Sequence, residues 1–432
     1  MNLRQAGVNL IDCDHRTPPA AEHGYPYIAI PQLKDGHLDL SDARRISEAD
    51  FIEWTKKLKP HAHDVIVVRR CNSGDSALIP PGLECAIGQN LVVLRSRGDL
   101  VHPKFLRWLV RGPEWWNEVG KFINVGAVFD SLRCRDIPNF EVTVPPLAEQ
   151  AAMAGVLDAL DDRIALLRET NATLEAIAQA LFKSWFVDFD PVRAKQQGIA
   201  PAGMDEATAA LFPGSFEDSP LNSVPVGWSV RSIGDAVDCV GGSTPDTKDA
   251  SYWSPEEHAW TTPKDLSGLP APVLIETERR LSTRGLSRIS SGLLPQGTLL
   301  MSSRAPIGYL AITQIPVAIN QGYIAIPPGG LLPPLYMLFW CRQNMASIKA
   351  HSNGSTFMEI SKRAFRPLSV LVPPGPVIEA FLAVAAPLFE RLVSNEQQAQ
   401  SVATLRDTLL PRLISGQLRL PEAEAEVQSA SA

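Results

Sequence analysis

The sequence predicts an α+β protein in which two mixed α/β domains are separated by two long antiparallel helices. The second half of the chain repeats the first at one constant offset, and the clearest stretch needs no gap. Each copy also runs from a globular segment into a long segment with heptad spacing of its apolar residues. A repeat this long is far beyond solenoid periods, so it indicates a pseudo-two-fold molecule within one polypeptide.

Short matched segments carry this internal repeat. They pair Gly126–Phe129 with Gly354–Phe357, Val144–Pro146 with Val372–Pro374, Arg163–Ile164 with Arg391–Leu392, and Leu181 with Leu409. Two similar domains on two similar helices are suited to bind two similar parts of a ligand at a fixed distance from each other. A bipartite ligand is therefore the first functional expectation.

The first domain is expected over residues 1–145, and a long helix over 146–190. Apolar runs at 65–68, 91–94 and 140–144 are typical of strands and indicate a mixed, strand-rich domain. The helix should stop beside Pro191, because proline lacks the amide hydrogen that the helical ladder needs.

A linker rich in proline, glycine and alanine is expected over 191–223, and the second domain over 224–375. A second long helix is expected over 376–416, in which Pro387 predicts a kink or a late start. Residues 417–432 form an acidic tail that we expect to be disordered.

Heptad spacing predicts that the two long helices pair with each other. Apolar residues alternate steps of three and four, which is the a/d seam of a coiled coil. The polar residues in the seam favour an antiparallel pairing that leaves room for partner helices, since a buried Asn fixes register at a cost in stability. The alternative is two ordinary amphipathic helices, each packed on its own domain. The seam comprises Leu157, Leu160, Ile164, Leu167, Asn171, Leu174, Ala178 and Leu181, and then Ala385, Leu388, Leu392, Asn395, Ala399, Val402, Arg406 and Leu409.

The net charge of -7 is unevenly distributed along the chain. Residues 1–145 carry 18 basic and 18 acidic side chains, residues 221–375 carry 13 and 10, and the rest carry 9 and 19. The acidity therefore belongs to the helices, the linker and the tail. Neutral to slightly basic domains are compatible with DNA binding, and acidic helices with protein partners.

Neither a membrane segment nor a disulfide framework is expected. Charged residues interrupt every apolar run, and the first residues lack the pattern of a signal peptide. The six cysteines are scattered without CxxC pairs, which suits a reducing cytoplasm and argues against a zinc knuckle. We expect a cytoplasmic protein without a metal site, and a surface turn at the close pair His61 and His63.

Four segments in a fixed order carry a family resemblance: Ala180–Val192, Val224–Trp228, Gly241–Asp265 and Leu409–Gly416. Together with the repeat, they resemble the specificity (S) subunit of type I restriction-modification systems over nearly the whole chain. The first domain departs from the pattern, because the Pro-x-Gly-Trp signal at Pro225–Trp228 has no counterpart before Asp12. We expect this domain to be trimmed there, or to begin as a different subtype, with an altered N-terminal edge strand.

The resemblance implies two target recognition domains, each reading one half of a split DNA sequence, on two antiparallel conserved helices. The implied partners are double-stranded DNA, two methyltransferase subunits bound by the helices and, in the full complex, restriction and translocase subunits. The resemblance implies no cofactor in this chain. S-adenosylmethionine, ATP and Mg²⁺ are expected on the partner subunits.

Polar loop residues in matching places of the two copies are candidates for DNA contacts. Arg, Asn and Gln make bidentate contacts with guanine or adenine edges in the major groove, whereas Lys is suited to phosphates. Arg304 is the strongest candidate, with a salt bridge inside its turn as the alternative; for the others the alternative is a solvated loop residue. The candidates are Lys34, Arg69, Arg70, Asn72, Ser73, Gln89, Asn90, Lys248, Lys264, Ser302, Ser303, Arg304, Asn320 and Gln321.

Catalytic motifs are missing from the sequence, which contains neither a GxxxxGK[ST] phosphate loop nor an Asn-Pro-Pro-aromatic tetrapeptide of adenine methyltransferases. We therefore expect a non-catalytic recognition subunit. Two other classes remain open. One is a stand-alone architectural DNA-binding or coiled-coil protein without a methyltransferase partner, and the other is a DNA-modifying enzyme with an unrecognised active site.

Overall fold

The computed structural model describes residues 1–126, 130–220, 222–354 and 358–431, and the chain divides into two compact units. Unit 1 comprises Met1–Ile164 and Ser401–Ala432, and unit 2 comprises Ala165–Gln400. The matched segments Gly126–Phe129 and Gly354–Phe357 lie, apart from their glycines, outside the described residues.

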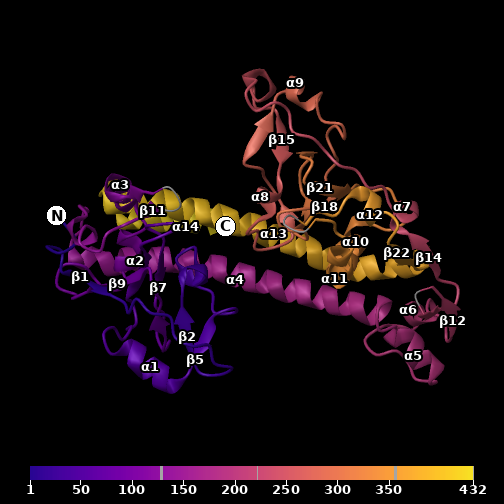
Figure 1. Cartoon of the computed structure of the whole chain (residues 1–432), viewed down its shortest axis with the longest axis horizontal. Helices are drawn as coiled ribbons and strands as arrows, with labels where there is room; N and C mark the ends of the chain where they lie inside the picture. Colours follow the sequence, from indigo (N-terminus) through magenta and orange to yellow (C-terminus); the bar gives the residue numbers. More distant parts are fainter. Residues whose placement is uncertain (127–129, 221, 355–357, 432) are drawn as a thin grey trace. The chain divides into compact units, whose positions relative to one another are not determined.

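Two long helices have nearly the bounds that the sequence predicts. Helix α4 spans Leu147–Phe186 and helix α13 spans Gly375–Ile414, each with 40 residues (Figure 1). Both ends of α13 lie 228 positions after those of α4 (375 − 147 and 414 − 186), so the helices keep the offset of the sequence repeat. The late start predicted from Pro387 is wrong, because α13 is already helical from Gly375.

The two long helices pack together in opposite directions. Within unit 2, the Nδ2 of Asn395 donates a hydrogen bond to the Oδ1 of Asn171 at 3.0 Å. Further along α4, the ring of Phe182 lies with its centroid 5.9 Å from that of Phe381, which precedes Asn395 in the chain. Residue numbers therefore rise along α4 as they fall along α13, and the antiparallel prediction is confirmed.

Burial supports the predicted seam. Asn171 and Asn395 are only 2% and 1% exposed, and the Nδ2 of Asn171 also donates to the carbonyl of Leu392 at 3.2 Å. The heptad residues serve both predicted purposes, the pairing of the helices and packing on a domain, because Leu157 and Leu160 also belong to the core of unit 1. The buried seam residues are Leu157, Leu160, Ile164, Leu167, Asn171, Ala178, Ala385, Leu392, Asn395, Ala399, Arg406 and Leu409, and the partly buried ones are Leu174, Leu181, Leu388 and Val402.

Unit 1 contains two principal sheets, each built around a buried strand. The first is antiparallel, in the order β1 (Val8–Asp12), β9 (Leu91–Ser96), β6 (Val65–Val68) and β7 (Ser76–Leu78). In the second, β2 (Tyr25–Ile28) is antiparallel to β5 (Arg44–Ile46) and parallel to β8 (Ala86–Ile87). All four residues of β6 are fully buried, so the continuous apolar run that predicted this strand is explained by its central place.

Unit 2 repeats three strands of the first sheet and all three strands of the second. Its first sheet has the order β16 (Val273–Leu274), β19 (Leu310–Thr313), β18 (Leu299–Ser302) and β21 (Tyr323–Ile326). In the second, β15 (His258–Thr261) is antiparallel to β17 (Arg279–Leu281) and parallel to β20 (Ala318–Ile319). The order β19-β18-β21 matches β7-β6-β9, and β17-β15-β20 matches β5-β2-β8, so the sequence repeat is also a repeat of strand order and direction.

The N-terminal edges of the two units differ, as the sequence suggests. In unit 2, β14 (Ser229–Ser232) pairs with β22 (Ser369–Val372). In unit 1, an isolated bridge between Asn2 and Glu141 takes the corresponding place. The terminal amine of Met1 donates to the carbonyl of Val142 at 3.1 Å and extends that bridge.

The aromatic residues of the family-like segment Ala180–Val192 form the core where the helices meet the second domain. Phe182, Trp185 and Phe186 are at most 6% exposed. The ring centroid of Phe186 lies 5.0 Å from that of Tyr336 in α10 (Pro334–Gln343) and 5.2 Å from that of Phe381. This segment therefore has a packing role.

Short elements complete the two units. In unit 1 they are η1 (Ile30–Gln32), β3 (Leu33–Lys34), β4 (His37–Leu38), α1 (Glu48–Thr55), α2 (Leu106–Leu109), α3 (Pro113–Phe122), β10 (Asn124–Val125), β11 (Asp130–Ser131) and η2 (Ile137–Asn139). In unit 2 they are α7 (Ile233–Ala236), η3 (Ala250–Tyr252), α8 (Pro263–Leu266), α9 (Thr283–Leu286), α11 (Met345–Ala350) and α12 (Lys362–Phe365).

Two regions are more ordered than their composition predicts. The expected disordered tail is instead helix α14 (Leu420–Ser431), whose Ala423 is fully buried in unit 1 and whose Glu426 pairs with Arg412 at 3.0 Å. The linker contains α5 (Asp190–Gln196), α6 (Glu206–Ala210) and the paired strands β12 (Phe216–Ser219) and β13 (Asn222–Pro225). Apolar anchors within the polar composition, such as Ala423, explain the order of the tail.

A buried charge cluster binds the last part of α13 into unit 1. The carboxylate of Asp161 on α4 is 1% exposed and pairs with Arg107, with Arg406 of α13 and, at 3.5 Å, with Arg111. His37 lies 3.3 Å from the same carboxylate. Burial alone would raise the pKa of Asp161, but the three arginines and His37 hold that pKa below its usual value. The polar seam residue Arg406 thus has its counter-ion on the opposite helix.

We expect Asp161→Asn to destabilise unit 1 by about 3 kcal/mol, because it leaves buried guanidinium groups without a counter-charge. Denaturant unfolding followed by circular dichroism measures this. Since folding lowers the pKa of Asp161, its stabilisation is present above the unfolded pKa and is lost as the pH falls through the folded one. The exposed neighbour Asp162 provides the control, and an equal loss in Asp162→Asn would contradict the role of the cluster.

Candidate nucleic-acid interface

Two turns of unit 1 lie side by side and carry most of its predicted DNA-binding residues. One turn follows β6 and the other connects β8 to β9. The amide of Arg69 donates to the carbonyl of Asn90 at 2.8 Å, which joins the two turns. The structure therefore brings the predicted residues Arg69–Ser73 and Gln89–Asn90 together.

Unit 2 has the same joint between its corresponding turns. The amide of Ser303, after β18, donates to the carbonyl of Gly322, before β21, at 2.8 Å. The hydroxyl of Thr244 donates to the Oε1 of Gln321 at 2.6 Å and adds a third loop. Ser302–Arg304 and Asn320–Gln321 thus lie together, in the same relation as in unit 1.

Three predicted DNA-binding residues are buried and stabilise these turns. Ser73, Ser302 and Ser303 are at most 4% exposed. The hydroxyl of Ser73 donates to the carbonyl of Arg69 at 2.9 Å, and that of Ser302 donates to the carbonyl of Pro306 at 2.7 Å. Ser302 also accepts from the amide of Tyr309 at 2.8 Å. Ser73 and Ser302 are structural, because buried hydroxyls with satisfied hydrogen bonds cannot reach a base, and Ser303 is withdrawn from the surface by its burial.

Amide side chains remain at the surface of both turns. Asn72, Gln89 and Gln321 are exposed. Asn72 and Asn90 adopt left-handed φ angles of 67° and 71°, which Asn tolerates better than most residues. The Oδ1 of Asn320 already accepts a hydrogen bond from the amide of Gly322 at 2.8 Å, and the donor Nδ2 is not part of this bond. Such amides offer both donors and acceptors to base edges.

The predicted basic residues differ in how far their charge is already paired. Lys34 pairs with Asp39 at 2.7 Å and Lys264 with Glu278 at 2.8 Å. Arg70 is exposed and Arg69 is partly buried. Lys248 is exposed, and it has no ion pair within the described part of the chain. Lys248 is therefore a stronger phosphate candidate than Lys34 or Lys264.

Arg304 lies at the edge of an open pocket of about 700 Å³ in unit 2. Its Nη1 is 3.8 Å from the Oε2 of Glu359, and its side chain is 39% exposed. An exposed ion pair at that distance is weak, so the guanidinium group remains available for a base. The pocket is lined by Arg304, Ala305, Pro306, Ile307, Lys349, Met358 and Glu359.

Unit 1 has a smaller pocket beside its own predicted turn. This pocket, of about 310 Å³, is lined by Tyr27, Gln32, Arg44, Gln89 and Asn90 together with neighbouring loop residues. An arginine and two exposed or half-buried amides thus line one pocket, together with Asp42 and the buried Tyr27. The combination is typical of surfaces that contact nucleic acids.

The residues that the sequence predicted to bind DNA do not include a tetrapeptide that occurs once in each unit. Arg44–Ser47 has the sequence Arg-Arg-Ile-Ser, and Arg279–Ser282 has the sequence Arg-Arg-Leu-Ser. In both copies the aliphatic residue is fully buried and the serine caps the next helix. The four arginines are exposed. The repetition of this tetrapeptide is the sequence signal that locates them.

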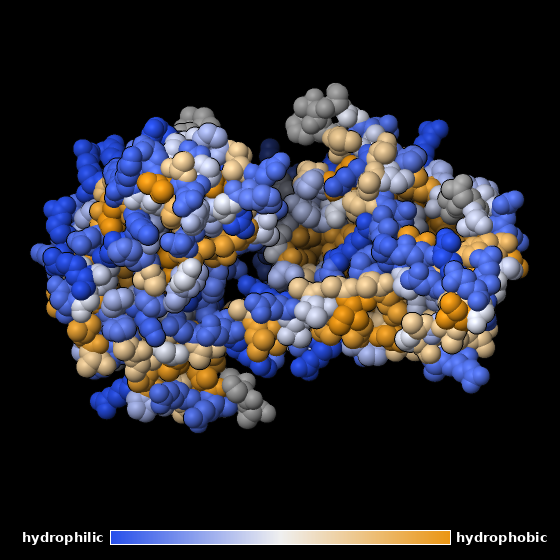
Figure 2. All heavy atoms as spheres, turned by 90° about the horizontal axis from the view of Figure 1, so that it is seen from below, coloured by the Kyte–Doolittle hydropathy of each residue, from blue (hydrophilic) through white to orange (hydrophobic). Residues whose placement is uncertain are grey.

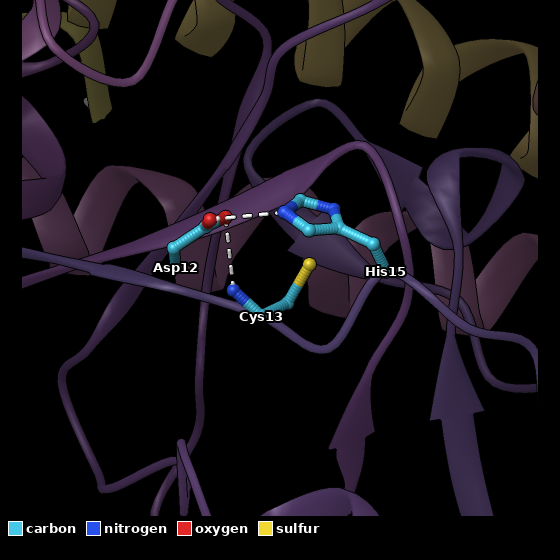
Figure 3. Close-up of side chains that lie close together, drawn as sticks. All are labelled: Asp12, Cys13 and His15. Atoms are coloured by element: carbon cyan, nitrogen blue, oxygen red, sulfur yellow. Dashed lines mark hydrogen bonds and ion pairs between the residues drawn. The ribbon is translucent and has the colours of Figure 1, made fainter.

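A second group of polar side chains lies at the end of β1. Figure 3 shows Asp12, Cys13 and His15, whose potential ligand atoms lie within 4.8 Å of one another. The carboxylate of Asp12 is already paired with His15 at 3.0 Å and with Lys57 at 3.7 Å. Burial, with a contribution from Asp12, raises the pKa of the Cys13 thiol to about 11. These contacts explain the cluster without a metal ion.

Comparison with known proteins gives two matches that coincide with the two copies of the repeat. The model of the type I restriction modification DNA specificity domain matches residues 15–176 and again residues 225–377. The chain is 24% identical over 375 residues to the type I restriction enzyme HindI specificity subunit of Haemophilus influenzae, covering 77% of this chain and 81% of that protein.

Two further comparisons agree with these matches. The type I restriction enzyme MjaIX specificity subunit of Methanocaldococcus jannaschii is 32% identical over 189 residues, which is 43% of each chain. The crystal structure of a type I restriction-modification S subunit from M. genitalium has a TM-score of 0.51 at 16% identity, covering 94% of this chain and 93% of that one. The latter similarity shows a common fold.

A membrane span requires a long and nearly uncharged apolar helix, and the described residues contain none.

Substituting the two exposed cations of unit 2 should separate base reading from phosphate binding. We expect Arg304→Ala to weaken binding to the specific sequence by about 1 to 3 kcal/mol and to relax discrimination at one base pair. Lys248→Ala should instead weaken binding to all sequences and lower the salt slope by about one. Titrations on duplexes that differ at single positions measure both effects. A uniform loss from Arg304→Ala would mean a phosphate or structural role for this residue.

Proposed function

Because this chain belongs to the type I restriction-modification DNA specificity family, whose members recognise DNA targets, we propose that each of its units reads one half of a split target. The observation that carries the proposal is the repeat of strand order and direction in the two units. Each unit has its own joined pair of polar turns. Two copies of one arrangement of strands and polar turns would suit the two halves of a bipartite sequence.

The paired helices are proposed to recruit two methyltransferase subunits. On α4, Leu166 and Ile177 are 53% and 50% exposed. These residues are eleven positions apart, which is about three helical turns, so they lie on one face of α4. The visible surface in Figure 2 is mostly hydrophilic with separate apolar patches. Under the proposal, these two side chains would be apolar contacts for a partner helix on the face of α4 that the seam leaves exposed.

The chemistry of modification and cleavage is assigned to the partners. S-adenosylmethionine would be bound by the methyltransferase subunits, and ATP and Mg²⁺ by the restriction and translocase subunits of a cytoplasmic complex. This chain would be non-catalytic. Support comes from the family and from the charged clusters at Asp161 and Asp12, whose carboxylates are paired internally.

The helices are also proposed to set the gap between the half-sites. A helix of 40 residues is about 60 Å long at 1.5 Å per residue. The antiparallel pair is held in register by the Asn171–Asn395 hydrogen bond. A length fixed in this way would make the gap a mechanical property of the protein, independent of the bases that are read.

Exchange of one domain tests the partition of specificity. We expect replacement of residues 221–375 by the equivalent domain of a related protein to change one half-site and to leave the other intact, because each unit has its own sheets and turns. Methylome sequencing of cells that express the hybrid with its methyltransferase measures this. Changes in both halves would contradict independent reading, and the unmodified chain in the same host provides the control.

Lengthening both helices tests whether they set the gap between the half-sites. One heptad adds about 10.5 Å while it restores the seam, so matched heptads after Asn171 and after Ala399 should widen the gap by roughly three base pairs. The recognised bases should not change. Four inserted residues break the seam and should abolish methyltransferase assembly. An unchanged gap in an active heptad-lengthened protein, read from its methylated motif, would show that the helices do not set the spacing.

A further inference from the structure

We infer that two arginine pairs, Arg44–Arg45 on β5 and Arg279–Arg280 on β17, bind the DNA phosphates that flank each half-site. The pairs would position each unit on the duplex without reading bases. This inference rests on the proposed function, in which each unit reads one half of the target. It adds a binding role for residues outside the turns described above.

The first arginine of each pair occupies the same place in the same sheet. In unit 1, Arg44 lies opposite Tyr27, and Tyr27 lies opposite Ala86. In unit 2, Arg279 lies opposite Trp260, and Trp260 lies opposite Ala318. Both rows therefore read arginine, aromatic residue, alanine. The tetrapeptide repeat is thus also a repeat of position.

The third strand of each row leads into the turn that carries the candidate base readers. Ala86 is followed within three residues by Gln89, and Ala318 within two by Asn320. Neighbouring strands are about 4.8 Å apart, so the arginine strand lies roughly 10 Å from the strand that enters this turn. The major groove is about 12 Å wide. A turn in the groove would therefore place the arginine strand near the phosphates at the groove's edge.

The four guanidinium groups are held in place by contacts that leave their charge unpaired, and Arg45 donates to the carbonyl of Gly24 at 3.4 Å. Arg44 donates to the carbonyl of Pro18 at 2.8 Å, and Arg280 to the carbonyl of Glu257 at 2.8 Å. The guanidinium carbon of Arg279 lies 3.5 Å from the ring centroid of Trp253. None of the four has an ion pair within the described residues. A fixed, unneutralised guanidinium group is well suited to a phosphate, because less side-chain entropy is lost on binding.

The two copies differ in the charge that surrounds the pair. In unit 2, Arg284 and Arg288 lie over the ring of Tyr252, with guanidinium carbons 5.3 Å and 5.6 Å from its centroid. In unit 1, α1 instead carries Asp50 and Glu53 after its arginine pair. The arginine pair of unit 2 thus has two further arginines nearby, whereas that of unit 1 has two carboxylates. Figure 1 shows β15 and α9 in the part of unit 2 away from the long helices. The phosphate contacts of unit 2 should therefore be the more numerous.

The test uses the full chain in complex with its methyltransferase partner. Two duplexes serve as probes, one with the motif found by methylome mapping and one of random sequence. The variants are Arg279→Gln/Arg280→Gln and Arg44→Gln/Arg45→Gln, with Arg279→Lys/Arg280→Lys as the charge-conserving variant. The single variant Arg279→Gln is also made, and Arg231→Gln, at an exposed position of β14, is its matched control because it removes one positive charge elsewhere in unit 2. Circular dichroism checks that each variant is folded.

We expect each double Gln variant to weaken binding to both duplexes by the same factor, and to lower the slope of log affinity against log salt by about two. The methylated motif should stay unchanged, and the Lys variant should retain most of the slope. An Arg279→Gln variant that binds both duplexes like the Arg231→Gln control, or a loss confined to one base pair of the motif in a double Gln variant, would overturn the inference. Failure of the unmodified complex to prefer its motif duplex would instead refute the proposed function.

Discussion

The rest of the structure depends on the antiparallel pairing of α4 with α13. Each unit contains residues from both copies of the repeat. Unit 1 includes residues from Ser401 onward, and unit 2 includes α4 from Ala165 onward. Leu409 and Leu413 of α13 are fully buried in the core of unit 1, and Phe182 of α4 is buried in the core of unit 2. Each domain core thus requires a segment of the other copy's helix. A displaced helix register would disturb both cores at once.

Buried polar contacts give this pairing its register at some cost in stability. The Asn171–Asn395 bond and the Asp161–Arg406 pair each place hydrogen-bonding groups in a seam where leucine would pack more favourably. Both groups are satisfied only in one alignment, because a shift of one residue would leave amide or charged groups buried without partners. The same alignment accompanies the burial of Leu409 in the core of unit 1 and of Phe182 in the core of unit 2. Under the proposed function, this would fix the gap between the half-sites.

The long helices and the internal repeat were the most predictable features, because a heptad seam and a repeat are patterns that extend over many residues. The predicted start of the first helix at 146 and the observed start at Leu147 differ by one residue. The tail was misjudged from its acidic composition, since a few small apolar residues such as Ala423 were enough to dock it. The candidate DNA-binding residues after β6 and β18 do lie in turns, and each turn adjoins a second one. The sequence could not distinguish an exposed hydroxyl from one that closes a turn, as at Ser73 and Ser302.

The arginine pairs illustrate a different limit of sequence reasoning. Singly, Arg44 or Arg279 resembles any solvated residue, and only the strand register shows that both stand opposite an aromatic residue in equivalent sheets. The repeat becomes informative when it is applied to structure as well as to sequence. Two diverged copies retain an exposed arginine pair that has no carboxylate partner among the described residues, which makes the pair a candidate for contact with a shared ligand. Under the proposed function, that ligand would be the DNA backbone.

The most direct test of the central claim is the methylome of a host that lacks other modification systems and expresses this chain with its methyltransferase partner. The account predicts one motif with two specified parts, separated by a gap of constant length in which any base is accepted. Methylation should depend on both parts together. A single uninterrupted motif, or two half-motifs that are modified independently of each other, would contradict the claim that two copies in one chain read one split target.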